Sequence, residues 1–243
     1  GAQPALVVEG LSSGTRLRGV SLQVRPGEVV GVGGLVGSGR SELLDAVFGL
    51  DPRAQGRVTA NGKEIGGKGP RAAIAAGVGY VPEDRRLQGL FFQMGIDENI
   101  TMPFMPSLAT AGFFRRFLAE RTLVSGRMSE FKVKAASPAS QPGELSGGNQ
   151  QKLLLARWMG RETKVLLLDE PTRGIDVGTK NEVYRLIKEA ASRGAAVLLV
   201  SSEMPELLAL SSRVLVMNEG RLTGELRGGE MTQANILRLA TSA

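Results

Sequence analysis

The chain has 243 residues, 42% of them hydrophobic and 22% charged, which suits one soluble globular unit with a sizeable core. Cysteine and histidine are both absent, which excludes disulfides, thiolate metal sites and a histidine base, so any chemistry must run on carboxylates. The net charge of +6 suits nucleotide phosphates, but Lys and Arg are scattered, which argues against a nucleic-acid surface.

The two ends of the sequence and its apolar runs bear on location. No run approaches the ~18 uninterrupted apolar residues of a membrane-spanning helix, and no basic start leads into an apolar signal region. The sequence begins Gly-Ala-Gln rather than with Met. We therefore expect a soluble, non-exported chain that has been cut from a longer protein.

Short strands open the chain. Residues 5–9 and 20–25 are predicted strands, and a Pro-Gly turn leads into a third at 28–32. No aromatic residue precedes Phe48, so the aromatic platform on which many nucleotide sites stack the adenine ring is missing. We expect a small β layer leading into the next motif.

The stretch GVGGLVGSGRS at 31–41 predicts a phosphate-binding loop. Its match to G-x-x-x-x-G-K-[ST] places Arg40 where the pattern has Lys. The glycines permit close backbone approach, and the start of the predicted helix 41–48 carries partial positive charge. Whether a planar, forked guanidinium fits beside a terminal phosphate is the open question. The expected nucleotide-binding residues are Gly34, Gly37, Ser38, Gly39, Arg40, Ser41 and Glu42.

A nucleotide-binding core continues to about residue 81, and a different segment follows. A hairpin around Asn61-Gly62, a helix at 70–76 and a strand at 78–81 complete the first part. From 82 to about 142 strand-like alternation ends, and 109–131 has apolar residues at mixed helical spacing, which indicates an inserted helical subdomain. Its apolar residues are core by default, with a partner surface as the alternative; they include Phe91, Phe92, Met94 and Phe104.

Two later segments carry further chemistry. LSGGNQQK at 145–152 predicts a second helix start with phosphate-binding N–H groups, although a simple Ser-capped helix fits the same letters. VLLLDE at 165–170 predicts a buried parallel strand that delivers Asp169 to hold Mg²⁺ and Glu170 to polarise an attacking water. The remaining chain alternates helices, predicted at 178–192, at 203–210 and from Met231 onward, with strands predicted at 196–200 and 214–217, as α/β units do.

Together these motifs resemble the nucleotide-binding domain of an ABC transporter. LSGGNQQK resembles the signature motif, VLLLDE the Walker B strand and GID at 174–176 the D-loop. GLVGSGRSEL, VPEDRR, DEPTRGIDVG and VSSEMPE are similar to the second of two fused ATPase halves in bacterial carbohydrate importers of the ribose, galactose and xylose type. The resemblance implies an α/β P-loop cassette with a mainly parallel sheet core, an antiparallel β layer and a helical subdomain.

The resemblance also implies roles for particular residues, with ATP and Mg²⁺ as cofactors. Catalytic roles fall to Glu170 and to Ser202, which aligns with the switch histidine. Metal contacts fall to Ser41, Asp169 and Glu83, which aligns with the Q-loop glutamine. The signature, which completes a partner's ATP site, comprises Leu145, Ser146, Gly147, Gly148, Asn149 and Gln150. The D-loop comprises Gly174, Ile175 and Asp176.

Four departures gather at one nucleotide: Arg40, Glu83, Ser202 and an aromatic A-loop lost between residues 11 and 17. They predict an asymmetric pair, in which this chain's Walker side is weak while its intact signature completes an active site in the other half. The alternatives left open are a regulatory or structural half without turnover, and half of a nucleoside importer.

The resemblance predicts partners, location and organisation as well. Expected partners are an N-terminal ATPase half of the same polypeptide, a transmembrane permease docking near 83–102 and, indirectly, a sugar-binding protein, but no nucleic acid. The expected location is the cytoplasmic face of a bacterial membrane. We expect one domain over 1–243, with 1–81 and 152–243 forming the core and 82–151 the Q-loop and helical subdomain.

Overall fold

The computed structural model describes residues 3–110, 114–160 and 162–241, and the chain divides into two compact units. The first unit is Gly1–Tyr80, Arg161–Glu170 and Ile187–Ala243; the second is Val81–Gly160 and Pro171–Leu186. No helix within the described ranges has the length and apolar character needed to cross a membrane. Each unit is described in turn.

An antiparallel layer in the first unit brings the chain to the phosphate loop. Its order is β2 (Leu17–Val24), β1 (Leu6–Ser13), β4 (Gln55–Ala60) and β5 (Lys63–Glu64). In β2 the residues Leu17, Val20, Leu22 and Val24 are buried while most of their neighbours are exposed, as expected for a sheet with one face on the core. The predicted hairpin at Asn61-Gly62 is confirmed by the pairing of β4 with β5.

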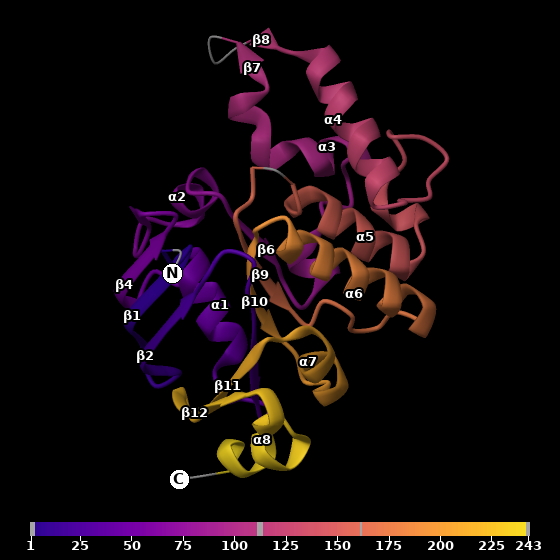
Figure 1. Ribbon diagram of the computed structural model, residues 1–243. Helices are drawn as coiled ribbons and strands as arrows, with labels where there is room; N and C mark the ends of the chain where they lie inside the picture. The colour runs from indigo at the N-terminus through magenta and orange to yellow at the C-terminus, as the bar shows by residue number, and fades with distance from the viewer. Residues whose placement is uncertain (1–2, 111–113, 161, 242–243) are drawn as a thin grey trace. The chain divides into compact units, whose positions relative to one another are not determined.

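The main sheet of the first unit is mainly parallel, as the sequence predicted (Figure 1). Its strands β11, β3, β10 and β9 run parallel, and β12 pairs antiparallel with β11 at one edge. Its order is β12 (Arg221–Arg227), β11 (Arg213–Asn218), β3 (Val29–Gly34), β10 (Ala196–Val200), β9 (Val165–Asp169) and β6 (Val78–Val81). Strands β3, β9 and β10 are buried throughout, as expected of parallel strands covered on both faces.

The register of three central strands positions the candidate site. Val200 at the end of β10 pairs with Asp169 at the end of β9 and with Val32 near the end of β3. Parallel strands therefore deliver the phosphate loop, the Asp169-Glu170 pair and the segment after Val200 to the same edge of the sheet.

Four helices belong wholly to this unit: α1 (Arg40–Phe48), α2 (Pro70–Ala75), α7 (Met204–Leu210) and α8 (Gln233–Ala240). Helix α1 packs against β3 and β9, α7 packs against β3, and α8 packs against β3, β11 and β12. The last helix was expected to start at Met231, but it starts two residues later because the Thr232 hydroxyl accepts from the backbone N–H of Asn235 and caps it.

The second unit is mainly helical. Helices α3 (Ile96–Thr101), α4 (Phe117–Glu130) and α5 (Gly147–Trp158) pack on one another (Figure 1). Helix α6 (Val177–Ser192) begins in this unit and ends in the first. Short turns complete it: a π-helical turn at Arg85–Gly89 and 3-10 turns at Met102–Ser107 and Pro142–Glu144; a further 3-10 turn, Gly228–Glu230, lies in the first unit.

One part of the helical subdomain differs from the prediction. Residues 109–131 were expected to be helical, but β7 (Ala109–Thr110) and β8 (Phe114–Arg115) pair antiparallel, and the helix begins at Phe117. Thr and Phe are strand-favouring residues, and local pairing wins over mixed helical spacing. Residues 111–113, which the prediction also covered, lie outside the described part of the chain.

Candidate functional site

The phosphate loop joins the end of β3 to the start of α1, and its backbone needs glycine at two positions. Gly34 has φ 153°, and a Cβ there would lie 2.5 Å from the carbonyl oxygen of Met217. Gly39 has φ 99°, and a Cβ there would lie 2.6 Å from the carbonyl oxygen of Arg16. Any side chain at either position would force the loop to shift, so the bare backbone remains available to a ligand.

One buried hydroxyl of the loop lacks a partner within the protein. The Ser38 hydroxyl is buried and has no hydrogen-bond partner. An orphaned buried hydroxyl is costly, and a loop built to receive phosphate oxygens is one setting in which it would be satisfied. Glu42, which the sequence placed among the nucleotide-binding residues, accepts a 2.6 Å hydrogen bond from Arg16 in the β1–β2 turn.

The Arg40 side chain reaches the segment that follows β10. Its side chain is only 9% exposed, and Nη1 donates a 2.8 Å hydrogen bond to the carbonyl oxygen of Ser201, just beyond β10. Its Nη2 lies 4.0 Å from Oε1 of Glu170. The guanidinium is thus engaged by the protein's own backbone and carboxylate.

Glu170 and Ser202 lie in direct contact. The Ser202 hydroxyl donates to Oε2 of Glu170 at 3.0 Å, and the Glu170 backbone N–H donates to the carbonyl of Val200 at 2.9 Å. Glu170 has φ 47°, a conformation that costs a non-glycine residue about 1–3 kcal/mol. Arg40, Ser201, Ser202 and Glu170 therefore form one connected set, which we call the arginine latch.

Asp169 is buried beside this set. The pKa of Asp169 is raised to about 6, and burial is the largest cause. The charges of Glu170 and Asp45 add to the rise, while hydrogen bonding with Ser41 and the charge of Arg40 oppose it. Its Oδ1 is buried without a hydrogen-bond partner. A carboxylate with an unsatisfied oxygen next to a hydroxyl is a donor set that Mg²⁺ accepts when nucleotide phosphates supply further oxygens.

Among the described residues, no cluster of three or more acidic, His or Cys side chains is placed to hold a metal ion. A fully protein-built metal centre is therefore absent from the described ranges. Mg²⁺ that relies on one or two carboxylates plus phosphate oxygens needs no such cluster, so Asp169 and Ser41 fit that mode of binding.

Glu83, the third expected metal contact, belongs to the second unit. Its carboxylate forms an ion pair with Arg173. Arg173 offsets the charge that distinguishes glutamate from the expected glutamine at this position.

The signature segment begins α5 in the second unit. The Ser146 hydroxyl caps the helix by accepting from the N–H of Asn149 at 3.4 Å. The buried Gln150 side chain donates to the carbonyls of Pro142 and Leu145 at 3.0 and 3.2 Å. Gly147 and Gly148 form the first turn of α5, and the Ser cap that the sequence allowed is present.

The D-loop of the same unit leads into α6. Gly174 has φ 69°, and Asp176 accepts hydrogen bonds from the Thr179 N–H and hydroxyl at 3.0 and 2.7 Å. These bonds lower the pKa of Asp176. The Asp176 carboxylate therefore ends the D-loop by capping the start of α6.

Sequence reasoning missed several partners of these residues. The Tyr80 hydroxyl donates to Oδ1 of Asp45 at 2.8 Å below the phosphate loop, and burial raises the pKa of Asp45. Arg173 and Arg85 belong to the motifs DEPTRGIDVG and VPEDRR, but those motifs did not indicate which groups the two arginines contact. An unusual acid at position 83 was the one signal that pointed to a basic partner nearby.

A family model described as "ABC transporter" matches residues 17–173. The chain is 46% identical to the ribose import ATP-binding protein RbsA of Bacillus licheniformis, over 91% of the chain and 45% of that protein. It is also 46% identical to RbsA of Rhodococcus jostii, over 98% of the chain and 47% of that protein. The chain thus spans less than half the length of these relatives.

Solved structures share the fold. The ATP-binding cassette MJ1267 of an ABC transporter has a TM-score of 0.79 at 21% identity, over 99% of this chain and 100% of that one. A dimeric post-hydrolysis state of the cassette MJ0796, bound to ADP and Pi, has a TM-score of 0.77 at 21% identity, over 91% and 98%. The expected P-loop cassette fold is confirmed.

Proposed function

The chain belongs to the ABC transporter family, and from that premise we propose that it is one nucleotide-binding half of a two-half ATPase that drives sugar import in bacteria. Its similarity to ribose import ATP-binding proteins supports the substrate class. Its span of less than half of those proteins supports a second half, which we place on the N-terminal side of this chain in the same polypeptide.

The two sides of this chain are proposed to act differently. The arginine latch carries this proposal, because Arg40 is held by the Ser201 carbonyl and lies near Glu170 instead of projecting freely toward a phosphate. The signature side keeps its Ser146 cap and a fixed Gln150. We assign weak or no hydrolysis to this chain's Walker side and the completion of an active site to its signature.

The residues that would hold MgATP follow from the donor sets. The phosphate loop would bind the phosphates through backbone N–H groups and Ser38, while Ser41 and Asp169 would hold Mg²⁺, with Glu83 as a further contact. Bound Mg²⁺ supplies charge stabilisation to the phosphates.

Glu170 is the group on this chain that would take a proton from water. Ser202 donates a hydrogen bond to its Oε2, and Arg40 lies near its Oε1. Ser202 has a hydroxyl where the family has an imidazole, so it donates one hydrogen bond but carries no positive charge.

A permease is the proposed membrane partner, with the chain at the cytoplasmic face of the membrane. Phe91 is 45% exposed and Phe92 less so, within the proposed contact region 83–102. Asn99 holds the intervening backbone by donating to the carbonyls of Phe91 and Gly95 at 3.0 and 2.9 Å, which gives a partner a fixed surface. We also propose that 82–151 acts as the helical subdomain and 1–81 with 152–243 as the core.

Turnover of MgATP by this chain alone, and then together with its partner half, tests the proposal. We expect little turnover alone and strong turnover together. Appreciable turnover by the chain alone would overturn the weak Walker side. Absence of turnover in both samples would support the alternative that the chain is a nucleotide-holding half.

A further inference from the structure

Arg85 lies where three segments of the second unit meet. It starts the π-helical turn Arg85–Gly89, which directly follows Asp84. The Asp84 carboxylate caps this turn by accepting from the N–H groups of Arg86 and Leu87 at 2.8 and 3.0 Å. With its backbone fixed in this way, the partly buried Arg85 side chain reaches back toward the signature and the D-loop.

The guanidinium makes three hydrogen bonds in two directions. Nη1 donates to the carbonyl of Arg173 at 3.1 Å and Nη2 to the carbonyl of Gly174 at 3.4 Å. Nε donates to the side-chain oxygen of Gln150 at 3.3 Å. Only a forked guanidinium has donors aimed at two consecutive carbonyls and, at the same time, at a third group to one side.

The signature side of this contact is itself fixed. Gln150 uses its amide nitrogen on the carbonyls of Pro142 and Leu145, so its oxygen is presented to Arg85. A Cβ at Gly147 would lie 3.0 Å from Nη2 of Arg85. A Cβ at Gly148 would lie 2.8 Å from the Thr179 hydroxyl. A side chain at Gly148 would thus collide with Thr179 of α6, and a side chain at Gly147 would press on the Arg85 guanidinium.

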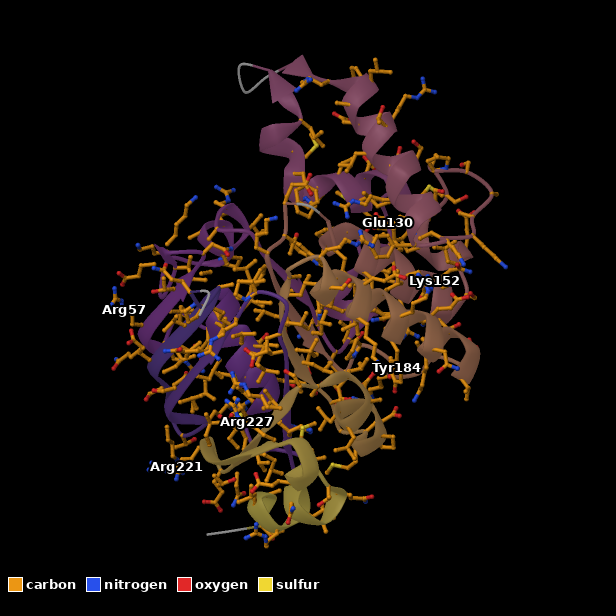
Figure 2. The ribbon with its side chains drawn as sticks, viewed as in Figure 1. Arg57, Glu130, Lys152, Tyr184, Arg221 and Arg227 are labelled. Carbon is orange, nitrogen blue, oxygen red and sulfur yellow. The ribbon has the colours of Figure 1, made fainter. Side chains whose placement is uncertain are left out.

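Other contacts join the same elements. Lys152 on α5, labelled in Figure 2, forms an ion pair with Glu182 on α6. Hydrogen bonding and the charge of Lys152 lower the pKa of Glu182. Arg85 differs from this pair because it holds the D-loop backbone itself, upstream of α6.

We propose that Arg85 is a positioning residue that holds the signature and the D-loop together as one rigid body. It acts through Gln150 and two carbonyl groups and is not assigned any contact with nucleotide. Because the proposed function makes the signature complete the partner half's ATP site, the inference rests on that function. Loss of Arg85 would loosen both segments and lower the rate at the partner's site, while this chain's own phosphate loop would bind nucleotide as before.

The test uses the complete two-half ATPase carrying Arg85→Lys or Arg85→Gln. Lysine keeps the charge but lacks the fork, so both variants should lower kcat by about 10-fold with little change in KM, since small misplacements of a reacting geometry have effects of this size or larger. Arg121→Gln is the control, because Arg121 is an exposed arginine on α4 of the same unit and lies outside the proposed contact region 83–102, and it should leave kcat unchanged.

Hydrogen exchange provides a readout that does not depend on activity. In both Arg85 variants, amides at 146–150 and 173–176 should exchange faster, while amides of the phosphate loop should not change. Full kcat in Arg85→Lys, or unchanged exchange at 173–176, would overturn the proposal. Should Arg85→Gln fail to fold, Gln150→Leu removes one of the three bonds and is expected to speed exchange at 173–176; unchanged exchange there would overturn the proposal too.

A third variant separates the inference from the function on which it rests. Ser146→Arg should abolish turnover if the signature completes the partner's site. If Ser146→Arg leaves turnover intact, the proposed function fails. Hydrogen exchange at 173–176 then still tests whether Arg85 holds the D-loop in place. If Ser146→Arg abolishes turnover while both Arg85 variants behave as wild type, only the inference fails.

Discussion

Arginine in place of lysine changes what the phosphate loop can reach. One nitrogen of the guanidinium donates to the Ser201 carbonyl, and another lies near Glu170. The single ammonium group of lysine has no second nitrogen with which to reach both groups. The latch therefore competes with phosphate for the same cation.

Arg40→Lys should strengthen nucleotide binding by the isolated chain. Lysine would release the Ser201 carbonyl and Glu170 and offer a compact charge to the phosphates, so we expect about a 10-fold gain in affinity for MgATP, or about 1.4 kcal/mol. Titration calorimetry measures it, with Arg16→Lys as the control near the same loop. An unchanged affinity would show that Arg40 is not limiting and would move attention to Ser202 and Glu83.

Asp169→Asn should stabilise the ligand-free chain at neutral pH. Because burial raises the pKa of Asp169 from 3.8 to about 6, the folded state is penalised wherever the carboxylate is ionised. That penalty is absent below pH 3.8, grows as the pH rises toward 6 and is constant above it. We expect a gain on the order of 2 kcal/mol at pH 7.5, from a shift of about two units.

Urea unfolding of wild type and Asp169→Asn at pH 4 and pH 7.5 measures the gain. The difference between the two proteins should nearly vanish at pH 4. Asp176→Asn is the control of opposite sign, because hydrogen bonds from Thr179 lower the pKa of Asp176 and its ionised form supports the fold. A destabilised Asp169→Asn at pH 7.5 would mean that burial does not dominate the titration.

Individual site residues were predictable where a motif fixes spacing along the chain, and their partners were not. Asp169, Glu170 and Arg40 follow from strand and loop patterns of a few residues. The bond from Arg40 to Ser201 joins residues 161 positions apart, and the pairing of Glu83 with Arg173 likewise depends on the folded chain. Such contacts leave no local pattern in a single sequence.

At the level of elements, one buried cluster ties the main sheet to the antiparallel layer within the first unit. Arg213 at the start of β11 donates to Glu28 at 2.7 Å and to Glu225 on β12 at 3.1 Å. Its Nη2 also donates to the carbonyl of Gln23 on β2. The arginine thus fixes the edge of the sheet opposite β6, far along the strands from the phosphate loop.

Arg213→Met should destabilise the chain and make it less sensitive to acid. Burial alone would raise the pKa of Glu28, but hydrogen bonds from Arg213 and the Arg25 N–H outweigh it and lower the pKa. The resulting stability is present above the usual value of 4.5 and is lost as the pH falls through the lowered pKa. We expect a loss of about 2 kcal/mol at pH 7.

Unfolding measurements at pH 7 and pH 3 check this expectation. The difference in the free energy of unfolding between variant and wild type should be smaller at pH 3. Arg227→Met is the matched control, because Arg227, labelled in Figure 2, also pairs with Glu225. Unlike Arg213, its side chain is 63% exposed. Its cost should stay below about 1 kcal/mol. If Arg213→Met and Arg227→Met lowered the free energy of unfolding equally, the buried cluster around Arg213 would have no special role.

The elements that sequence patterns predicted best are the buried strands. Continuous apolar runs gave β9 and β10 with the bounds found, since full burial on both faces leaves no other arrangement for such runs. The β7–β8 pair was missed because two-residue strands have no periodicity to detect. The π-helical turn at Arg85–Gly89 was missed too, because it depends on the Asp84 cap and not on a repeating pattern.

For the whole molecule, one chain is proposed to contribute unequally to two ATP sites. Its Walker side carries the arginine latch, and its signature side carries Ser146 and Gln150 held in place. The identity of the family follows from ordered motifs in the sequence, but the latch becomes visible only in the folded chain. The proposed asymmetry therefore rests on the contacts that Arg40, Ser202 and Glu170 make in the folded chain.

The most direct test compares Glu170→Gln with Ser146→Arg in the complete two-half ATPase. Loss of one well-placed transition-state contact costs about 100-fold or more, so the variant at the site that turns over should fall by that amount. We expect Ser146→Arg to lower the turnover of the two-half ATPase by about 100-fold. Glu170→Gln should lower the total turnover by less than about half. A loss in Glu170→Gln equal to or greater than that in Ser146→Arg would contradict the proposed asymmetry.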